Sequence, residues 1–298
     1  MHEHLQLNPK LEPKEYKMRI SKGDLFPKIL VWTSALLVST VFLLILSSIV
    51  WHGLGQISWE FLTASPENAG RTGGIGPILV STGLILGVCI ATALPIGLGT
   101  AIMLSEFTSS ESIFGGFVRR SLDILAGVPS IVFGLFGFVF FSNFLGLGFS
   151  ILSGGLTLAC MVLPILIRST EEGFRSVPED YRMSAASLGF SKTTTIFKII
   201  LPAAAPGLTV GLILGVGRAI AETAALLYTS GYVDRMPTSL LDSGRALSIH
   251  IFDLSMNVPG GNERAYASAF VLVSILIIIN MTSFYISNHW LRRRLMTI

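Results

Sequence analysis

Long apolar runs dominate the sequence, and they set the expected architecture. Six stretches are long enough, or nearly so, to cross a bilayer as helices, which takes about 20 residues. They are about 29–51, 75–104, 122–141, 151–167, 203–227 and 267–290. Glycine and proline interrupt the second, third and fourth runs, and neighbouring helices can satisfy the backbone groups that this frees. The pattern predicts an all-α polytopic membrane protein with six transmembrane helices.

The composition leads to the same class. Only 13% of the 298 residues are charged and 51% are hydrophobic, whereas soluble domains carry about 25% charged residues. These values exclude a disordered chain, a disulfide scaffold and a nucleic-acid binder. Cys89 and Cys160 both lie in apolar runs, which favours two core residues over a disulfide or a metal pair. The histidines show no metal-ligand spacing, so no metal site is expected.

The basic residues predict an orientation. Sixteen lysines and arginines fall in residues 1–28, in alternate loops and at the C-terminal end, whereas the opposite loops carry Arg71, Arg235, Arg245 and Arg264. Since positive charge accumulates on the cytoplasmic side, both termini are expected in the cytoplasm. Residues 1–28 are predicted to form a polar cytoplasmic tail, and they lack the apolar core of a signal peptide. Residues 29–298 read as one transmembrane domain.

The cytoplasmic loop at about 168–202 has a structure of its own. Acidic residues in the first turn favour a helix over 179–188, and Gly189 is a helix stop. Ser191 can cap a second short helix that ends at about residue 200, before Pro202. The sequence therefore predicts a helix–glycine–helix element. Its small apolar side chains either dock in a partner's groove or lie on the membrane surface.

Two ionisable residues lie deep in the fifth run. Arg218 and Glu222 are four residues apart, so a continuous helix would place them on one face. Such residues inside a membrane are functional candidates by default, although a structural pair that locks helix packing is the alternative. An arginine suits an anionic substrate because guanidinium binds oxyanions in a bidentate way and keeps its charge. Thr223 either offers a hydroxyl to the path or bonds back to its own helix.

Two more charges border the fourth and third runs. Arg168 lies at the cytoplasmic end of the fourth run and is either a second arginine of the path or an anchor that follows the positive-inside pattern. Asp123, at the start of the third run, is expected to pair with Arg119 and Arg120. In the outer loop, residues 247–252 suggest a short interfacial helix, in which His250 is expected to be no ligand.

The cytoplasmic loop resembles the EAA motif of ABC-importer permeases, in which E-A-A is followed by three residues, G, nine residues and I-x-L-P. Gly189 and the segment 199–202 match this spacing. Upstream the match is partial, since Met183 and Ser184 replace Glu and Ala. In that family the element is the coupling helix, which docks on a cytoplasmic ATPase. The resemblance implies the following docking residues: Tyr181, Met183, Ala185, Ala186, Leu188, Gly189 and Phe190.

The segment 217–224, GRAIAETA, is similar to permeases of the bacterial high-affinity phosphate importer, as are the stretches 73–82, 125–134 and 163–172. Over about residues 25–295 the chain looks most like the A-type permease of that importer, within the MetI-like ABC permease family. The resemblance implies a type I ABC-importer permease fold in the inner membrane and phosphate transport. It implies a translocation path that includes Arg218, Glu222, Arg168 and Thr223.

The same resemblance implies partners. They are a homologous C-type permease in a heterodimer, a cytoplasmic ATPase dimer and an external phosphate-binding protein. The chain contains no G-x-x-x-x-G-K-[ST] sequence, the phosphate-cradling loop of many ATPases. We therefore expect a non-catalytic subunit without a cofactor, with ATP and Mg²⁺ bound by the partner ATPase.

Three alternatives remain at this stage. An ABC permease for phosphonate, molybdate or sulfate would share the architecture. A proton-coupled secondary transporter would use Glu222 as its proton carrier, although the chain shows none of the internal repeats typical of that class. An intramembrane enzyme would need a nucleophile and a base at membrane depth, and neither histidine nor cysteine is placed beside Arg218 and Glu222 to provide them.

Overall fold

A computed structural model describes residues 25–109 and 111–295. The chain divides into two units, residues 1–47 and 48–298. The first unit holds most of the apolar helix α1 (Leu25–Gly53), which matches the first predicted span. Of the predicted polar tail over residues 1–28, residues 1–24 lie outside the described part of the chain.

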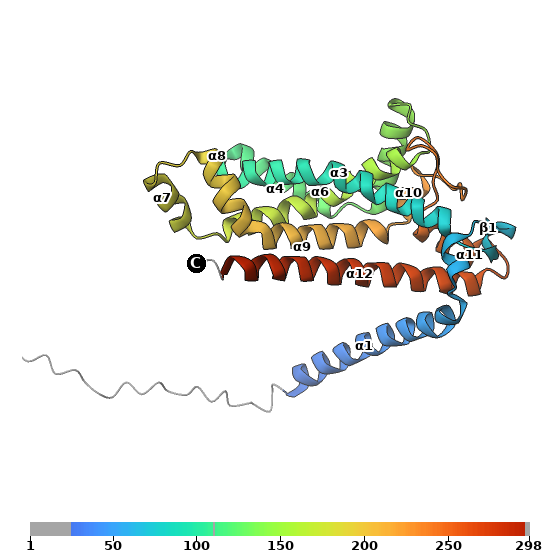
Figure 1. The fold of residues 1–298 in the computed structure, drawn as a ribbon. Coiled ribbons are helices and arrows are strands. Elements are labelled where there is room, and N and C mark those ends of the chain that lie inside the picture. The colour runs from blue at the N-terminus through green and yellow to red at the C-terminus, as the bar shows by residue number, and fades with distance from the viewer. Residues whose placement is uncertain (1–24, 110, 296–298) are drawn as a thin grey trace, which may run out of the picture. The chain divides into compact units, whose positions relative to one another are not determined.

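Four long helices form the body of the second unit (Figure 1). They are α3 (Gly76–Glu106), α6 (Ile151–Arg175), α9 (Leu201–Ile220) and α12 (Asn262–Leu295). Helix α6 packs between α3 and α9, and α12 packs on α9. Buried side chains such as Ile85, Leu158 and Leu166 form the core between α3 and α6. Cys89 in α3 and Cys160 in α6 are free thiols, as expected of core residues.

Short elements lie at both ends of the long helices (Figure 1). One end, here called the α7 end, carries α7 (Glu179–Ser187) and α8 (Lys192–Thr195). The opposite end, here called the α11 end, carries α2 (Trp59–Thr63), α10 (Ala224–Leu227) and α11 (Leu247–Met256). It also includes the single turns η2 (Leu54–Gln56) and η3 (Asn68–Gly70) and an antiparallel pair of strands, β1 (Pro66–Glu67) and β2 (Thr72–Gly73).

The third predicted span is a bent pair of helices instead of one straight helix over 122–141. It consists of α4 (Ile113–Ala126) and of α5 (Ser130–Gly137), which continues into the π-helical η4 (Phe138–Phe144). The chain bends by 102° between the two halves. The bend falls at Gly127 and Pro129, because proline lacks the amide proton that would continue the helix and disfavours helical backbone in the residue before it.

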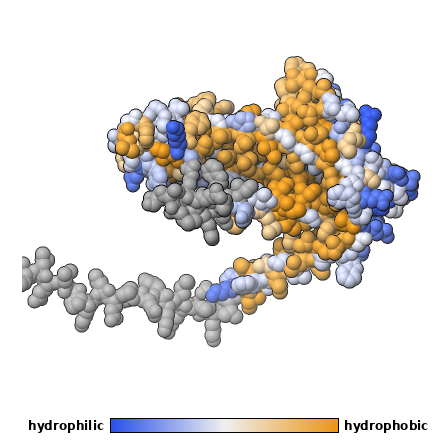
Figure 2. Space-filling model, viewed as in Figure 1, coloured by the Kyte–Doolittle hydropathy of each residue, from blue (hydrophilic) through white to orange (hydrophobic). Residues whose placement is uncertain are grey.

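Five helices of the described chain are long and apolar enough to cross a membrane, or six if the bent pair counts as one span. The prediction of six spans is met on that second count. Figure 2 shows apolar side chains over the middle of the long helices and polar ones gathered at the α11 end. Such an apolar band on the outside is what a protein embedded in lipid presents.

Several predicted boundaries differ from those of the structure. Helix α6 continues to Arg175, two turns beyond the predicted end of the fourth run. The short helix predicted to end before Pro202 runs on through η5 (Ile196–Ile200) into α9, as one helix from Lys192 to Ile220. The π-helical turn η5 shifts the hydrogen-bond register just before Pro202, which accommodates its missing amide proton. The loop between the long helices is therefore shorter than 168–202.

Candidate functional site

Arg218 lies in the last turn of α9, and its guanidinium group has no partner among the described residues. The side chain is partly buried. Among the side chains of residues 26–109 and 111–285 and the backbone that the structure describes, no group forms a hydrogen bond or an ion pair with it. A guanidinium group offers five N–H donors and is always charged. Arg218 can therefore receive an oxyanion without first releasing a partner among the described residues.

Glu222 does not share a helix face with Arg218, and that expectation was wrong. Helix α9 ends at Ile220, and Glu222 follows it in a break before α10. There its Oε1 accepts a hydrogen bond from the amide of Ala225 at 3.2 Å, so the side chain caps the short helix. Its carbonyl oxygen accepts a hydrogen bond from Ser248 Oγ at 2.5 Å. The cap and this contact with α11 stabilise the break.

Thr223 also lies in the break. It is the residue before α10, with φ −117° and ψ −51°, and its side chain makes no capping hydrogen bond. Its carbonyl oxygen accepts a hydrogen bond from the amide of Leu227 at 3.0 Å. The structure thus brings Arg218, Glu222 and Thr223 together at the end of α9, in an irregular segment instead of on one helix face.

Glycines set how closely α9 approaches α6. A Cβ atom on Gly207 would lie 2.5 Å from Cα of Gly173, and one on Gly215 would lie 2.5 Å from Val162 Cγ1. The two helices are therefore antiparallel and in close contact, as small residues permit in membranes. Ser169 Oγ donates a hydrogen bond across this contact to the carbonyl of Gly207 at 2.8 Å.

Arg168 lies on α6 in the half nearer the α7 end. Counted from the Val162–Gly215 contact, Arg218 is level with about residue 159, so the two arginines are about 13 Å apart along the helix axis at 1.5 Å per residue. Arg168 Nε donates to Asp123 Oδ1 at 3.0 Å, and its Nη2 donates to Oδ2 at 2.5 Å. The arginine and the aspartate are 35% and 59% exposed. Unlike Arg218, Arg168 is already paired.

The expectation that Asp123 pairs with Arg119 and Arg120 was wrong. Arg119 lies one turn from Asp123, but its Nε donates to Glu171 Oε1 at 2.7 Å and its Nη2 donates to the carbonyl of Leu104 at 3.0 Å. Glu171 is only 3% exposed and also pairs with Arg175 at 3.0 Å. This buried carboxylate binds arginines from α4 and α6 and so leaves Asp123 to Arg168.

The α7 end contains the predicted helix–glycine–helix element. Gly189 has φ +76° and follows α7, a conformation that glycine adopts without strain. Ser191 Oγ accepts a hydrogen bond from the amide of Thr194 at 3.2 Å and caps α8. The predicted stop and the predicted cap are both confirmed.

Six of the seven residues predicted to dock an ATPase are exposed: Tyr181, Met183, Ala186, Leu188, Gly189 and Phe190. Leu188 is 73% exposed. Ala185 is 1% exposed and packs inward. In this structure Ala185 supports α7 from within and offers no surface to a partner.

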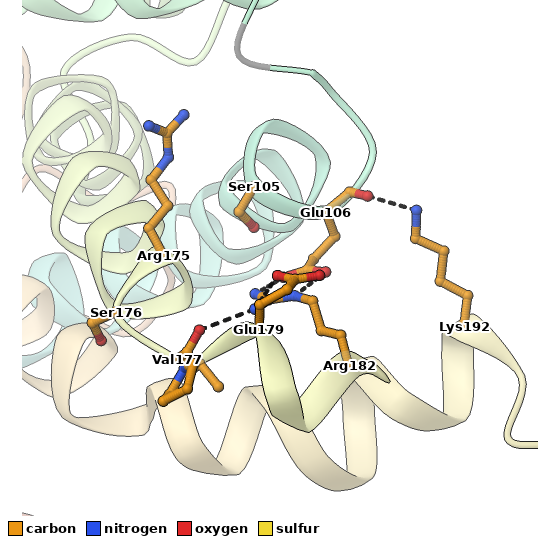
Figure 3. Close-up of a pocket in the computed structure, with 9 residues that line it drawn as sticks. Ser105, Glu106, Arg175, Ser176, Val177, Glu179, Arg182 and Lys192 are labelled. Carbon is orange, nitrogen blue, oxygen red and sulfur yellow. Dashed lines mark hydrogen bonds and ion pairs between the residues drawn. The ribbon is translucent and has the colours of Figure 1, made fainter. Parts of the chain in front are cut away.

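Arg182, on the inner side of α7, was missed by the sequence analysis. It binds Glu106 at the end of α3, with Nη2 and Oε1 at 2.6 Å, and it lines a pocket of about 640 Å³ with Arg175, Glu179 and Lys192 (Figure 3). The Glu106 carboxylate raises the pKa of the Arg182 guanidinium above its ordinary value. The only signal in the sequence was a lone acidic residue at the end of an apolar run.

Long apolar helices around a glycine-packed core, with a broken helix at one end and an exposed helix–glycine–helix element at the other, define a membrane protein with several spans. Residues 93–297 match the family described as binding-protein-dependent transport system inner membrane component, and the chain belongs to that family. Its members are ABC transporter permeases of the MetI-like type.

Two relatives illustrate the similarity. The chain is 28% identical over 264 residues to the probable ABC transporter permease protein YqgI of Bacillus subtilis (strain 168), which covers 84% of this chain and 90% of that protein. It is 33% identical over 224 residues to the phosphate transport system permease protein PstA 1 of Mycobacterium tuberculosis (strain CDC 1551 / Oshkosh), which covers 74% of this chain and 73% of that protein. The predicted resemblance to the A-type phosphate permeases is thereby confirmed.

Solved structures share the fold. A bacterial alginate ABC transporter in complex with an alginate pentasaccharide-bound periplasmic protein matches with a TM-score of 0.59 and 16% identity, over 90% of this chain and 96% of that chain. An inward-facing MetNI methionine ABC transporter matches with a TM-score of 0.55 and 18% identity, over 73% of this chain and 94% of that chain. The predicted fold, an ABC-importer permease, is confirmed.

Proposed function

We propose that this chain is a permease subunit of an ATP-driven phosphate importer. The observation that carries the proposal is Arg218, a guanidinium group at the end of a membrane helix with no partner among the described residues. Relatives named as phosphate transport permeases support the choice of substrate. Phosphate is an oxyanion, and arginine binds its oxygens with two parallel hydrogen bonds.

In this proposal the path runs along α6 and α9 and passes two arginines at different depths. The anion first meets Arg218 and the hydroxyl of Thr223 in the break after α9. It then reaches Arg168, where Asp123 competes for the same donors. Glu222 shapes the path by capping α10 instead of neutralising Arg218. The charged groups along this path need water or protein around them, because lipid solvates charge poorly.

The exposed face of α7 serves as the docking site for an ATPase. Tyr181, Met183, Leu188 and Phe190 are apolar or aromatic, and all are exposed outside the apolar band of the long helices. A helix laid into a groove binds through such side chains. ATP and Mg²⁺ are bound by that ATPase dimer, so this chain does no chemistry of its own. The α7 end and both termini then face the cytoplasm.

The remaining partners complete the importer. A homologous C-type permease forms a heterodimer with this chain and supplies the other wall of the path. An external phosphate-binding protein delivers the anion at the α11 end. That end carries the long, partly exposed loop over residues 228–246 and the helix α11, whose first turn contacts the break after α9 through Ser248.

The test is uptake of radioactive phosphate into proteoliposomes that contain this chain with its partner permease, ATPase and binding protein. We expect uptake that requires ATP. Arg218→Gln removes the charge and should abolish uptake. Arg218→Lys keeps the charge without the two-pronged geometry and should retain a small part of the uptake. The wild type and both variants should assemble equally with the partner subunits.

Three results would contradict the proposal. Normal uptake by Arg218→Gln would remove Arg218 from the path. Uptake driven by a proton gradient without ATP would make the protein a secondary transporter. Stronger competition by phosphonate, molybdate or sulfate than by unlabelled phosphate would assign the permease to another oxyanion. As a matched control, the exposed Arg120→Gln should leave uptake unchanged, since Arg120 forms no ion pair with any described residue.

A further inference from the structure

The docking helix α7 is connected to two of the long helices by the backbone and to a third only by side chains. Along the chain, α7 follows α6 and precedes the continuous helix α8–η5–α9. Movement of α7 therefore reaches α6 and α9 through short connections. Helix α3 ends at Glu106, more than 70 residues earlier in the sequence, so movement reaches its end only through contacts in space.

Arg182 provides such a contact at the centre of this junction. Its Nη2 and Nε atoms bind the two oxygens of Glu106 at 2.6 and 3.2 Å, a two-pronged ion pair. The Glu106 side chain is 6% exposed, so water screens the pair little. Bidentate arginine–carboxylate pairs fix orientation as well as distance. The end of α3 is therefore held to α7 in a defined geometry.

The same guanidinium group also holds the end of α6. Nη2 donates to the carbonyl of Phe174 at 3.1 Å, and Nη1 donates to the carbonyl of Val177 at 3.0 Å. Phe174 lies in the last turn of α6, where carbonyls lack a partner within the helix, and Val177 lies just beyond the end of that helix. One side chain thus joins α7, the end of α6 and the end of α3.

Lys192 adds a second link to α3. Its Nζ donates to the carbonyl of Glu106 at 2.6 Å and lies 4.2 Å from the ring centre of Phe107. Figure 3 shows Arg182 and Lys192 reaching Glu106 from α7 and α8 respectively. The end of α3 is thus bound by both helices of the docking element, through Arg182 of α7 and Lys192 of α8. Both side chains line the pocket of about 640 Å³.

We propose that the Arg182–Glu106 pair is the link that couples α7 to α3, so that a movement imposed on the docking helix displaces α3 together with α6 and α9. This inference rests on the proposed function, since it assumes that an ATPase moves α7. Arg182 and Glu106 act as positioning residues and contact neither ATP nor substrate. Without the pair, α7 still docks and moves, but the end of α3 follows less closely, through the core that α3 shares with α6 and through Lys192 alone.

The first experiment compares transport with ATP hydrolysis in the same proteoliposomes. Arg182→Lys keeps the charge but removes the two-pronged geometry, and Glu106→Gln keeps the shape but removes the charge. Each should lower phosphate uptake per ATP hydrolysed about fivefold or more. ATP hydrolysis and the amount of co-purified ATPase should stay near wild type, and the exposed Arg120→Gln should retain wild-type coupling.

The double variant tests whether the two residues act as one unit. If they do, Arg182→Lys with Glu106→Gln should be no worse than either single variant. Unchanged uptake per ATP in both single variants would overturn the proposal. Loss of co-purified ATPase would also overturn it, because Arg182 would then serve docking. Failure of the wild-type complex to take up phosphate with ATP would instead refute the proposed function.

A second measurement does not depend on the substrate. Spin labels on Ser109→Cys, just beyond α3, and on Ser187→Cys, at the end of α7, report the distance between the two elements in a background with Cys89→Ala and Cys160→Ala. Both serines are exposed. In the assembled wild-type complex this distance should be the same with and without trapped nucleotide, whereas in Arg182→Lys it should change. A distance that stays constant in both proteins would overturn the proposal.

Discussion

The close contact between α6 and α9 predicts that Gly207→Ala destabilises the protein. The added Cβ would lie 2.5 Å from Cα of Gly173 and 2.9 Å from the carbonyl oxygen of Ser169. Both are backbone atoms, which cannot turn away as a side chain can. The helices must separate, and this also stretches the hydrogen bond from Ser169 Oγ to the carbonyl of Gly207.

The expected cost follows from three effects. Overpacking a close contact destabilises by about 1–3 kcal/mol, and weakening the hydrogen bond removes about 1 kcal/mol. The better helix propensity of alanine returns up to about 1 kcal/mol. The net loss is about 2 kcal/mol, which lowers the unfolding midpoint by about 3 °C for a chain of this size.

Thiol-reactive dye fluorescence in detergent measures this unfolding, because Cys89 is buried in the folded protein. Gly217→Ala is the matched control, since a Cβ there meets no atom within 4 Å. It should be neutral or slightly stabilising. Gly211→Ala should fall between the two, because its nearest neighbours lie 3.1–3.3 Å away. Equal midpoints for Gly207→Ala and Gly217→Ala would refute the close packing of α6 and α9.

Two further predictions concern charge. Burial and the nearby Arg245 lower the pKa of His250 from 6.5 to about 4, so the unfolded chain takes up the proton first as pH falls. Stability should therefore fall between about pH 6.5 and 4, by about 2 kcal/mol from pH 7 to pH 5. His250→Gln should flatten this slope in tryptophan-fluorescence unfolding, and an equal slope in both proteins would contradict the burial of a neutral histidine. Glu171→Gln should cost about 3–5 kcal/mol, because it leaves Arg119 and Arg175 without their buried carboxylate. The exposed neighbour Glu172→Gln should change stability by less than about 0.5 kcal/mol in the same assay, and similar losses for the two variants would count against a buried network.

The parts of the fold that the sequence predicts correctly depend on local chemistry. The length of each apolar run predicts the length of a membrane-spanning helix. The turn after α7 follows from the conformational freedom of Gly189 and the hydroxyl of Ser191. The bend at residues 127–129 was readable in principle, since Pro129 disfavours a straight helix. The length of the apolar run over 122–141 nevertheless favoured one straight helix, because membrane helices often tolerate proline.

The parts that failed depend on groups far apart in the sequence. The apolar pattern continues past Ile220, so nothing local predicts the end of α9. The break is held by Ser248, 26 residues further along. In the same way Asp123 has Arg119 one turn away, yet it pairs with Arg168 on another helix, 45 residues on. Spacing along a helix says which residues can meet, and the packing of helices decides which of them do.

The end of α9 at Ile220 changes what Arg218 can do. Had the helix continued, Glu222 would lie one turn from Arg218 and would neutralise it, as neighbouring opposite charges on a helix do. An arriving anion would then have to displace a tethered carboxylate. In the structure the carboxylate caps α10 instead, and no described residue neutralises the guanidinium group. An unpaired charge at membrane depth costs at least about 2.5–3.5 kcal/mol. Water in the path can solvate the empty guanidinium group, and under the proposed function a transported phosphate neutralises it in passing.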